Sequence, residues 1–590
     1  MTMLEIAGET LAQVGSLPGR GWRRLARLRG ESDERLVLML PLAVAVGIAS
    51  GLSAVALRSG VHEVFHWLAG VRSGALGIAL PAGGMVLGVL VVRKLFREAP
   101  GHGVPQVIRA VCRDGGRMPR RSILSRWVGS MLTVSAGGSA GLEAPIVFSA
   151  GALGSAIGGL AKVDERRRSV LLACGVAGGI AGIFNAPITG LVFAMEVVLA
   201  EWSALSIVPV VLAAVSATEL SRNLLGNAGA FSHSSFEMST TDLLWCVGLG
   251  IVSGFVSAAL ARTLRFFERV SEKLPAREIV APAVLGLGVG VAGLVMPQAV
   301  GEGYETAQAA ISGNLAAGVW LCAALALAKI VTTGLTLGSG APGGVFAPCL
   351  VVGSVVGVCF SRAAQAVLPA GHPLAHEGSY ALAGMSGLVA GVMHAPLTGI
   401  LLVVEVTGGY QLILNLMLVA VISLVVARQF DRHSIYTEAL AERGELLRPG
   451  TDRRILSDLR VHETLDQFVD PVRETMTLAD FVEVVKKSKR NHFPVLRADG
   501  VTFAGILHLG DVRELLFDPE LARLTLIGTV MDANVARVPA DADLSDALEI
   551  FERTGAWVLP VVDGERFAGL LSKSTLFDHY RRELSVQAPG

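Results

Sequence analysis

The stretch that decides the fold is Gly338-Ser-Gly-Ala-Pro-Gly-Gly-Val-Phe-Ala-Pro348, a glycine-rich loop that opens an apolar helix. Bare backbone amides at a helix start, with the positive end of the helix dipole behind them, suit a bound anion. A phosphate-binding loop would carry a Lys beside the glycines, and none stands here. The loop therefore favours a small monovalent anion over a nucleotide. Taken alone, the glycines also fit a second interpretation, in which they serve only the close packing of helices.

Segments of the first half of the chain recur in the second half. The matching pairs are Gly141-Leu-Glu-Ala-Pro145 with Gly344-Val-Phe-Ala-Pro348, Ala186-Pro-Ile-Thr-Gly190 with Ala395-Pro-Leu-Thr-Gly399, and Gly101-His-Gly103 with Gly301-Glu-Gly303. Their offsets are 203, 209 and 200 residues, and a Glu-Val pair follows both Ala-Pro segments, at 196–197 and 405–406. Three matches in order, at nearly constant spacing, indicate an internal duplication. Duplicated halves with broken helices place a binding site near the middle of a membrane, where the halves meet.

The composition excludes several classes of protein. Of the 590 residues, 52% are hydrophobic and only 17% are charged, against about 25% charged in ordinary soluble domains. So few charges cannot cover a soluble surface, and the hydrophobic content excludes intrinsic disorder. The 50 Lys and Arg residues balance the 50 Asp and Glu residues, so no bulk charge points to a nucleic-acid partner. The chain is expected to be a membrane protein in contact with lipid.

Apolar segments follow one another from residue 36 to about residue 440. Four runs are long enough to cross a bilayer, which takes about 20 residues: Leu36–Leu57, Leu76–Val92, Leu243–Leu260 and Ile279–Val295. Other runs are broken, around Gly137, Pro187, Gly338 and Pro396, and such breaks are tolerated where they line a protected cavity. We expect an all-α polytopic membrane domain over 36–440, built from two inverted-topology repeats with broken helices, about 36–220 and 240–440.

Basic residues predict which side of the membrane faces the cytoplasm. Residues 1–35 carry the cluster Arg20, Arg23, Arg24, Arg27 and Arg29 and lack the long apolar core of a signal peptide. They are expected to form a basic cytosolic segment. The nine Lys and Arg residues from Arg93 to Arg126 also favour the cytoplasmic side. The expected location is the cell (inner or plasma) membrane, crossed many times, with both termini in the cytoplasm.

The chain after residue 440 changes to a soluble composition. Two segment pairs repeat there: Phe493-Pro-Val-Leu496 and Phe503-Ala-Gly-Ile-Leu507 in a first copy, and Leu559-Pro-Val-Val562 and Phe567-Ala-Gly-Leu-Leu571 in a second. Two β-α-β-β-α units of this size resemble a pair of CBS domains. The expected organisation is a linker over 441–455, a first CBS domain over 456–520 and a second over 521–584.

The resemblance to CBS domains implies a possible nucleotide site. Asp511 matches the position that often holds a ribose, and the second copy has Thr575 there. At most one adenine-nucleotide site is therefore expected, and a nucleotide bound there would regulate the membrane domain. In the alternative interpretation, the pair serves only folding and dimer contact.

The membrane motifs together resemble the CLC chloride channel and transporter family. The stretch from Gly338 to Pro348 matches the third signature of that family almost letter for letter. Gly141-Leu-Glu-Ala-Pro145 is similar to Gly-Arg-Glu-Gly-Pro, with the Arg and the second Gly replaced. Gly101-His-Gly-Val-Pro-Gln106 is similar to Gly-Ser-Gly-Ile-Pro-Glu, and Tyr436 stands where the family has its anion-facing tyrosine. The resemblance implies a homodimer with one anion pathway per subunit.

Glu143 is the candidate gate. A carboxylate inside a membrane is costly and indicates function, and at an anion-binding helix start it can occupy the anion's own site and leave when protonated. The resemblance places Glu143 on the family's gating glutamate. It also implies a set of anion contacts, from backbone amides and the Tyr436 hydroxyl: His102, Gly103, Gly141, Leu142, Ala144, Val345, Phe346, Ala347 and Tyr436.

His102 stands where the family has a serine. An imidazole N–H can donate to an anion, and an unperturbed pKa of about 6.5 would make conductance or selectivity depend on pH. In the alternative interpretation, His102 lines the inner mouth, bonds to backbone and does not affect the ion.

The mode of transport depends on the segment after Asn185-Ala-Pro187. Proton-coupled members of the family carry a second glutamate at its inner end, and counting without a gap gives Val197, with Glu196 just before it. Because Val cannot relay a proton, we expect a voltage- or pH-gated passive channel for chloride or a similar anion. The alternative is a chloride/proton antiporter or weakly coupled carrier that uses Glu196, Glu201 or His102.

The sequence favours neither an enzyme nor a cation transporter. An enzyme needs a nucleophile with a base or a metal set, and a cation site needs clustered carboxylates in the spans. The carboxylates at Glu143, Glu196 and Glu405 lie in separate segments. No catalytic residue, metal or resident cofactor is therefore expected, apart from chloride as bound ligand and the adenine nucleotide considered above.

Overall fold

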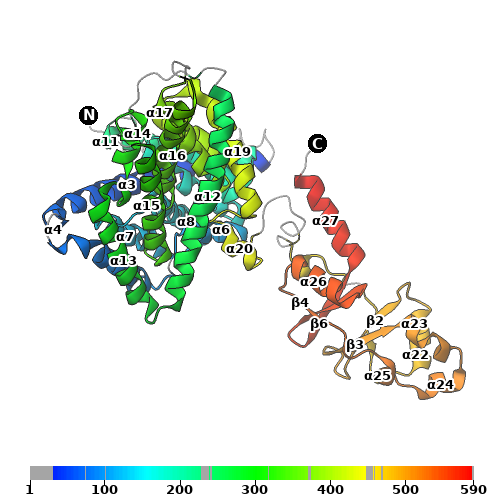
Figure 1. Ribbon diagram of the computed structural model, residues 1–590. Helices are drawn as coiled ribbons and strands as arrows, with labels where there is room; N and C mark the ends of the chain where they lie inside the picture. Colours follow the sequence, from blue (N-terminus) through cyan, green and yellow to red (C-terminus); the bar gives the residue numbers. More distant parts are fainter. Residues whose placement is uncertain are drawn as a thin grey trace, which may run out of the picture. The chain divides into compact units, whose positions relative to one another are not determined.

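The computed structural model describes residues 31–72, 75–99, 101–226, 231, 238, 242–315, 318–369, 374–446, 456, 459–466 and 469–587. The chain forms two compact units, Met1–Leu446 and Leu447–Gly590 (Figure 1). Their boundary falls within the expected linker, of which residues 447–455 lie outside the described part. The arginine cluster of the expected N-terminal segment, residues 20–29, also lies outside it.

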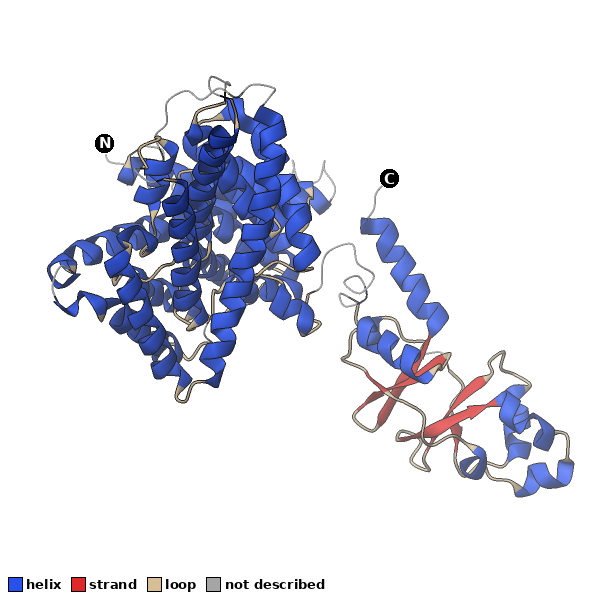
Figure 2. Cartoon of the chain, viewed as in Figure 1, coloured by secondary structure: helices blue, strands red, loops and turns tan. Residues whose placement is uncertain are grey.

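The described part of the first unit is helical (Figure 2). Among its described residues, ten helices are long and apolar enough to cross a membrane. The four long runs expected from the sequence are confirmed as helical spans. They lie in α3 (Glu31–Trp67), in α5 (Leu80–Leu90) with its flanking turns, in α12 (Asp242–Lys273) and in α13 (Arg277–Val295).

The two halves of this unit carry the same succession of helices. After α3 and α5, and after α12 and α13, the pairs in chain order are α6 (Val104–Cys112) and α14 (Tyr304–Ile311), α7 (Ser122–Ser135) and α15 (Val319–Gly338), α8 (Glu143–Leu160) and α16 (Phe346–Val367), α9 (Glu165–Phe184) and α17 (Glu377–Met393), α10 (Pro187–Phe193) and α18 (Pro396–Thr407), and α11 (Ala204–Leu225) and α19 (Ile413–Phe430). The internal duplication is therefore a duplication of structure.

Helix breaks occur where the sequence predicts them. Both α10 and α18 begin at the proline of an Ala-Pro pair, and each follows a residue in the left-handed conformation, Asn185 with φ 58° or His394 with φ 55°. A left-handed residue ends the preceding helix, and proline fits the first turn of the next one. Helix α10 continues as a π-helical turn, Ala194–Leu199, which has no counterpart in α18.

The two halves are joined through their glycine loops. The Gly141 amide donates to the Gly344 carbonyl and the Gly344 amide donates to the Gly141 carbonyl, both at 2.8 Å, in an antiparallel bridge. A Cβ atom at Gly141 would lie 2.0 Å from Glu143 Oε2 and 2.9 Å from the Ala347 Cβ atom, so only glycine fits. Equivalent residues that exchange equivalent bonds in opposite directions are related by a two-fold axis, as inverted repeats require.

One basic residue of the segment that the sequence assigns to the cytoplasmic side is buried inside the protein. Arg126, on α7, is 1% exposed, and its Nη2 donates to the Ala99 carbonyl. Its guanidinium also lies over the Phe148 ring, 5.5 Å from the centroid. Arg126 is therefore enclosed by the protein and not solvated, which a count of basic residues does not reveal.

The second unit contains two copies of one α/β motif. Each copy has one three-stranded sheet. The sheet of the first copy contains β1 (Val472–Arg473), β2 (His492–Leu496) and β3 (Phe503–His508). The sheet of the second copy contains β4 (Val538–Pro539), β5 (Val558–Asp563) and β6 (Arg566–Ser572). The first two strands pair in parallel and the last two antiparallel, and Val472 opposite Val495 corresponds to Val538 opposite Val561. Helices α22 (Leu478–Val485) and α26 (Leu544–Thr554) connect the parallel strands. The predicted β-α-β-β-α order is confirmed.

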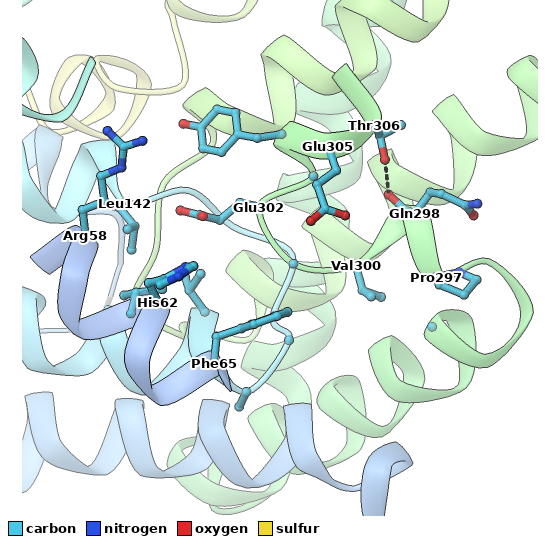
Figure 3. Close-up of a pocket in the computed structure, with 18 of the residues that line it drawn as sticks. Arg58, His62, Phe65, Leu142, Pro297, Gln298, Val300, Glu302, Glu305 and Thr306 are labelled. Carbon is cyan, nitrogen blue, oxygen red and sulfur yellow. Dashed lines mark hydrogen bonds between the residues drawn. The ribbon is translucent and has the colours of Figure 1, made fainter. Parts of the chain in front are cut away.

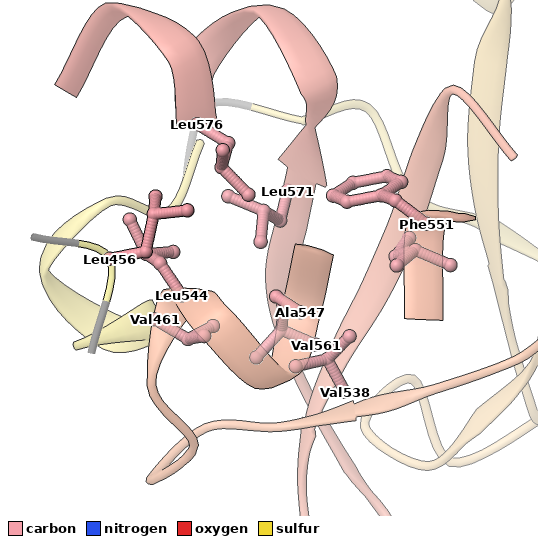
Figure 4. Close-up of a cluster of buried hydrophobic side chains, with 10 residues drawn as sticks. Leu456, Val461, Val538, Leu544, Ala547, Phe551, Val561, Leu571 and Leu576 are labelled. Atoms are coloured by element: carbon pink, nitrogen blue, oxygen red, sulfur yellow. The ribbon is translucent and has the colours of Figure 1, made fainter. Parts of the chain in front are cut away.

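The core of the second copy gathers around α26. Phe551 is fully buried and clusters with apolar side chains of the adjacent sheet and of α27 (Lys573–Gln587), among them Val538, Val561 and Leu576 (Figure 4). This burial holds the helix on its sheet.

We predict that Phe551→Ala lowers the stability of the second copy by about 3–5 kcal/mol, because it leaves a large cavity. Limited proteolysis of the purified full chain, read by mass spectrometry, should show faster cleavage within residues 520–587. Phe517→Ala is the control, since Phe517 lies in the same unit and is 84% exposed. Equal cleavage rates for the two variants would contradict the packing described here.

Candidate anion-binding site

Glu143 is the first residue of α8 and lies inside the protein, 1% exposed. Its Oε1 atom accepts a hydrogen bond from the Tyr304 hydroxyl, at the start of α14. In the part of the chain that the structure describes, its Oε2 atom has no hydrogen-bond partner. The backbone amides of Glu143 and Ala347 lie close enough to stabilise negative charge on this carboxylate. The carboxylate therefore sits where two helix N-termini present their amides.

The start of α16 faces the start of α8 across the Gly141–Gly344 bridge. The Phe346 ring packs between the rings of Phe184 and Phe193, with centroid separations of 5.6 and 6.2 Å. The six predicted contact residues of the two loops are all buried in this one place: Gly141, Leu142, Ala144, Val345, Phe346 and Ala347.

Tyr436 reaches the same place from the end of the membrane unit. It lies between α19 and α20 (Glu438–Glu442) and is 1% exposed. Its hydroxyl is close enough to Cys349, on α16, and to Glu143 for electrostatic interaction. Tyr436 therefore lies buried in the same unit, within electrostatic range of the carboxylate that the sequence singled out.

His102 and Gly103 lie further along α8. Gly103 has φ 89° and precedes α6, and a Cβ atom there would lie 3.0 Å from the Phe148 Cβ atom. Phe148 is five residues beyond Glu143, or about 7.5 Å along the helix axis. His102 is half-buried, and its Nδ1 atom has no hydrogen-bond partner among the described residues. The His102 loop thus flanks α8 at a distance from the carboxylate.

A cavity of about 1420 Å³ reaches Glu143. Leu142, Glu143 and Tyr304 line it beside Arg58 of α3 and Glu302, and Figure 3 shows the Arg58 and Glu302 side chains entering from different elements. The gate candidate therefore has an approach path from one end of the membrane unit.

The sequence analysis missed four residues of this cavity and its surroundings: Arg58, Glu302, Tyr304 and Lys329. The internal duplication holds the signal for two of them. An offset of 200 aligns Glu302 with His102, and an offset of 203 aligns Lys329 with Arg126. Tyr304 had no such signal, because its bond to Glu143 joins residues 161 apart in the chain.

Lys329 and Arg126 are buried cations at equivalent positions. Lys329, on α15, is 0% exposed, and its Nζ atom donates to the Gly301 carbonyl at 2.7 Å. Arg126 makes the corresponding bond to the Ala99 carbonyl. Each basic side chain therefore holds the loop that precedes a short helix, α14 or α6.

Glu196 of the first repeat caps α18 of the second repeat, and Glu405 of the second repeat caps α10 of the first. Each carboxylate accepts three hydrogen bonds of 2.7 to 3.1 Å. Glu196 accepts them at the start of α18, from the amides of Leu397 and Thr398 and from the Thr398 hydroxyl. Glu405 accepts them at the start of α10, from the amides of Ile188 and Thr189 and from the Thr189 hydroxyl. A carboxylate at a helix N-terminus is stabilised in its charged form. The bonds give Glu196 the same structural role as Glu405.

The other positions considered for proton transfer lie apart from this cap. Val197 is half-buried in the π-helical turn after α10. Glu201 follows that turn and forms an ion pair with Arg166, with a separation of 3.8 Å. No described contact joins either residue to Glu143.

The two positions aligned with the CBS ribose site differ in their surroundings. Asp511, in the first turn of α23 (Leu509–Leu516), is largely exposed, and its Oδ1 atom lies 3.5 Å from His508 Nδ1. Thr575 hydrogen-bonds to Ser572 through its hydroxyl, at 2.8 Å, and through its amide, at 3.1 Å. Asp511 is thus the more accessible of the two.

Comparison of the chain with models of known protein families shows the family to which it belongs. The model of the voltage gated chloride channel family matches residues 83–428, more than half of the chain, and the CBS domain model matches residues 467–518 and 527–582. The chain belongs to the voltage gated chloride channel (CLC) family and carries a CBS pair.

Curated relatives and solved structures agree with this assignment. The chain is 31% identical over 420 residues to a putative chloride channel protein ClcB-like from Ralstonia nicotianae, covering 68% of this chain and 96% of that protein. It is 31% identical over 441 residues to the H(+)/Cl(-) exchange transporter ClcA of Salmonella arizonae, covering 71% and 91%. The crystal structure of a slow cyanobacterial Cl−/H+ antiporter superimposes with a TM-score of 0.63 at 28% identity, covering 69% of this chain and 98% of that one.

The reciprocal caps generate a paired prediction. Glu196→Gln and Glu405→Gln should each lower the free energy of unfolding by about 1–3 kcal/mol, because each replaces the charged acceptor of three hydrogen bonds by a neutral one. Thermal unfolding of the full chain in detergent should therefore show similar losses for the two variants. Glu201→Gln is the control and should unfold near the wild-type temperature, since its ion pair is long. A loss confined to one of the two capping variants would contradict their equivalence.

Proposed function

We propose that this chain transports chloride or a similar small anion across the membrane through a path gated by Glu143. One observation carries the proposal: the buried Glu143 carboxylate lies against the amide-bearing starts of α8 and α16. An ionised carboxylate there competes with an anion for the same amides. Protonation removes its charge, so the side chain can leave and the anion can bind. The protein would then act as a transporter or channel and not as an enzyme.

The other predicted contacts fit a path through this point. The Tyr436 hydroxyl and the amides of Val345 and Phe346 would hold the anion on the inner side of the carboxylate. The loop of His102 and Gly103 would line the continuation of the path along α8, and the cavity would supply anions to the opposite side of Glu143.

We propose passive conduction as the mode of transport. Val197 has no group that can carry a proton, and the Glu196 carboxylate is engaged by three donors at the start of α18. A second candidate, chloride/proton exchange, is favoured by the names of the relatives, which include an exchange transporter and an antiporter. Exchange would require another proton route, through Glu201, His102 or a displaced Glu196.

Current reversal distinguishes the two modes. In a planar bilayer with opposed chloride and proton gradients, we expect the reversal potential of the reconstituted full chain to follow chloride alone. A membrane without protein is the control for leak. A reversal potential that moves with the proton gradient would establish exchange and overturn passive conduction.

The gate has its own test. Glu143→Gln mimics the protonated carboxylate, so we expect chloride efflux from liposomes to persist and to lose most of its dependence on pH. The variant should elute from gel filtration as the wild type does. If a folded Glu143→Gln protein carried no chloride, Glu143 would not be the gate.

Sidedness, assembly and ligand binding complete the proposal. The exposed basic residues before α7, such as Arg113 and Arg120, favour a cytoplasmic position for that face and for both termini. Because the repeats are inverted, the loop of Glu302 then lies at the outer face.

The family resemblance implies a homodimer with one path per subunit. The exposed Asp511 is the candidate contact for one adenine nucleotide in the CBS pair.

A further inference from the structure

We propose that Arg265 is a positioning residue for Tyr436, because its guanidinium joins both ends of the segment that carries the tyrosine. The inference rests on the proposed function, in which the Tyr436 hydroxyl holds the anion. Arg265 acts on the anion only through the tyrosine.

The Arg265 side chain, on α12, forms two ion pairs. Its Nη2 atom lies 2.5 Å from Asp431 Oδ1, and its Nη1 atom lies 2.6 Å from Glu438 Oε1. Asp431 directly follows α19, and Glu438 begins α20. The planar guanidinium presents several donors at once, so one ordered side chain connects the end of one helix with the start of the next.

Water has limited access to these three side chains. The exposed fractions are 23% for the Arg265 side chain, 12% for Asp431 and 31% for Glu438. Charges that are partly removed from water interact more strongly than fully exposed charges, which water and salt screen. An isolated surface pair contributes little to stability, whereas here one cation holds two carboxylates with short bonds. The pairs are therefore suited to keep residues 431 and 438 in fixed places.

The segment between the two carboxylates forms a bonded turn around Tyr436. The Ser434 amide donates to the Thr437 hydroxyl at 3.1 Å, and the amides of Thr437 and Glu438 each donate to the Ser434 carbonyl at 3.0 Å. Ser434, Tyr436 and Thr437 are all buried. A turn with its own hydrogen bonds moves as a unit, so holding its two flanks restrains the backbone of Tyr436.

Helix α12, which carries Arg265, packs closely against α19 (Figure 1). A Cβ atom at Gly254 would lie 2.5 Å from the Val426 Cβ atom, and one at Gly250 would lie 2.8 Å from the Ile422 Cβ atom. Arg265 stands eleven residues after Gly254, which is about three helical turns, so it projects from the same face of α12. The close packing of this face therefore gives the guanidinium a fixed base.

The chain offers a matched control for each side of the ion pairs. Arg269 stands four residues after Arg265 on α12. Glu442 stands four residues after Glu438 on α20. Both control residues are exposed, and neither forms an ion pair with a described residue. A change at either one removes the same charge from the same helix without touching the segment of Tyr436.

The test measures the conductance of the full chain in a planar bilayer, with chloride replacing gluconate on both sides. For Arg265→Gln, we expect the chloride concentration at half-maximal conductance to rise about three- to tenfold, the effect of losing one hydrogen bond to the ion. Tyr436→Phe should raise this concentration by a similar factor. In a protein that already carries Tyr436→Phe, Arg265→Gln should cause no further rise, because no hydroxyl is left to position. Arg269→Gln should keep the wild-type value.

Glu438→Gln is a second variant that decides the question if Arg265→Gln does not fold. It leaves Arg265 paired with Asp431 and removes one of the two pairs, so we expect a smaller rise of about twofold. Glu442→Gln should keep the wild-type value. A merely structural role would lower the number of active molecules, and so the maximal conductance, and would leave the half-maximal concentration unchanged.

The possible outcomes separate this inference from the proposed function. A folded wild-type chain without chloride conductance would overturn both. An unchanged half-maximal concentration in Tyr436→Phe would remove this tyrosine from the proposed path, and the inference would fail with it.

Other outcomes overturn the inference alone. One is a raised value in Tyr436→Phe with an unchanged value in a folded Arg265→Gln or in Glu438→Gln. Another is a further rise when Arg265→Gln is added to Tyr436→Phe, because the effect would then not pass through the tyrosine. An equal rise in Arg269→Gln would also overturn it, since the charge of α12 and not the ion pairs would be responsible.

Discussion

The reciprocal hydrogen bonds between Gly141 and Gly344 are the constraint on which the membrane unit depends. They fix the starts of α8 and α16 against each other, so the positive ends of two helix dipoles converge inside the protein. The approach leaves little room for side chains, since a Cβ atom at Gly141 would lie 2.9 Å from the Ala347 Cβ atom and one at Gly344 would lie 3.0 Å from the Ala144 amide nitrogen. A chain with zero formal net charge can therefore build an attractive site for an anion from its backbone alone.

The two halves repeat their scaffold and differ along the proposed path. Glu196 and Glu405 are identical and make identical bonds, and Asn185 and His394 adopt the same left-handed conformation. By contrast, Glu143 is aligned with Phe346 and His102 with Glu302. Two-fold symmetry supplies the geometry of the site, and the substitutions that break this symmetry supply its chemistry. Function is thus concentrated where the repeats disagree.

The fold and most of the site could be predicted from the sequence, because glycine and proline motifs mark helix breaks directly. Tyr304 could not, since its bond to Glu143 joins residues 161 apart in the chain. The burial of Arg126 could not be predicted either, because the sequence shows its charge and not its surroundings. The offset of 203 residues that aligns the two glycine loops also aligns Arg126 with Lys329. The duplication could therefore have identified these two equivalent basic residues, which the short motifs do not contain.

The role of a membrane carboxylate depends on its donors more than on its place in a motif. Counting from Asn185 places Glu196 next to the proton-relay position. Its hydrogen-bond donors, however, are equivalent in position to the donors of Glu405 in the other repeat. A relay must release and accept protons readily, whereas a cap is stabilised while it remains charged. Glu143 also lies at a helix N-terminus, but its side-chain partners differ: the Tyr304 hydroxyl donates to one oxygen, and the other oxygen has no hydrogen-bond partner among the described residues. Glutamate therefore has two different sets of partners in this unit: Glu196 accepts three bonds from the opposite repeat, and Glu143 accepts one from a side chain.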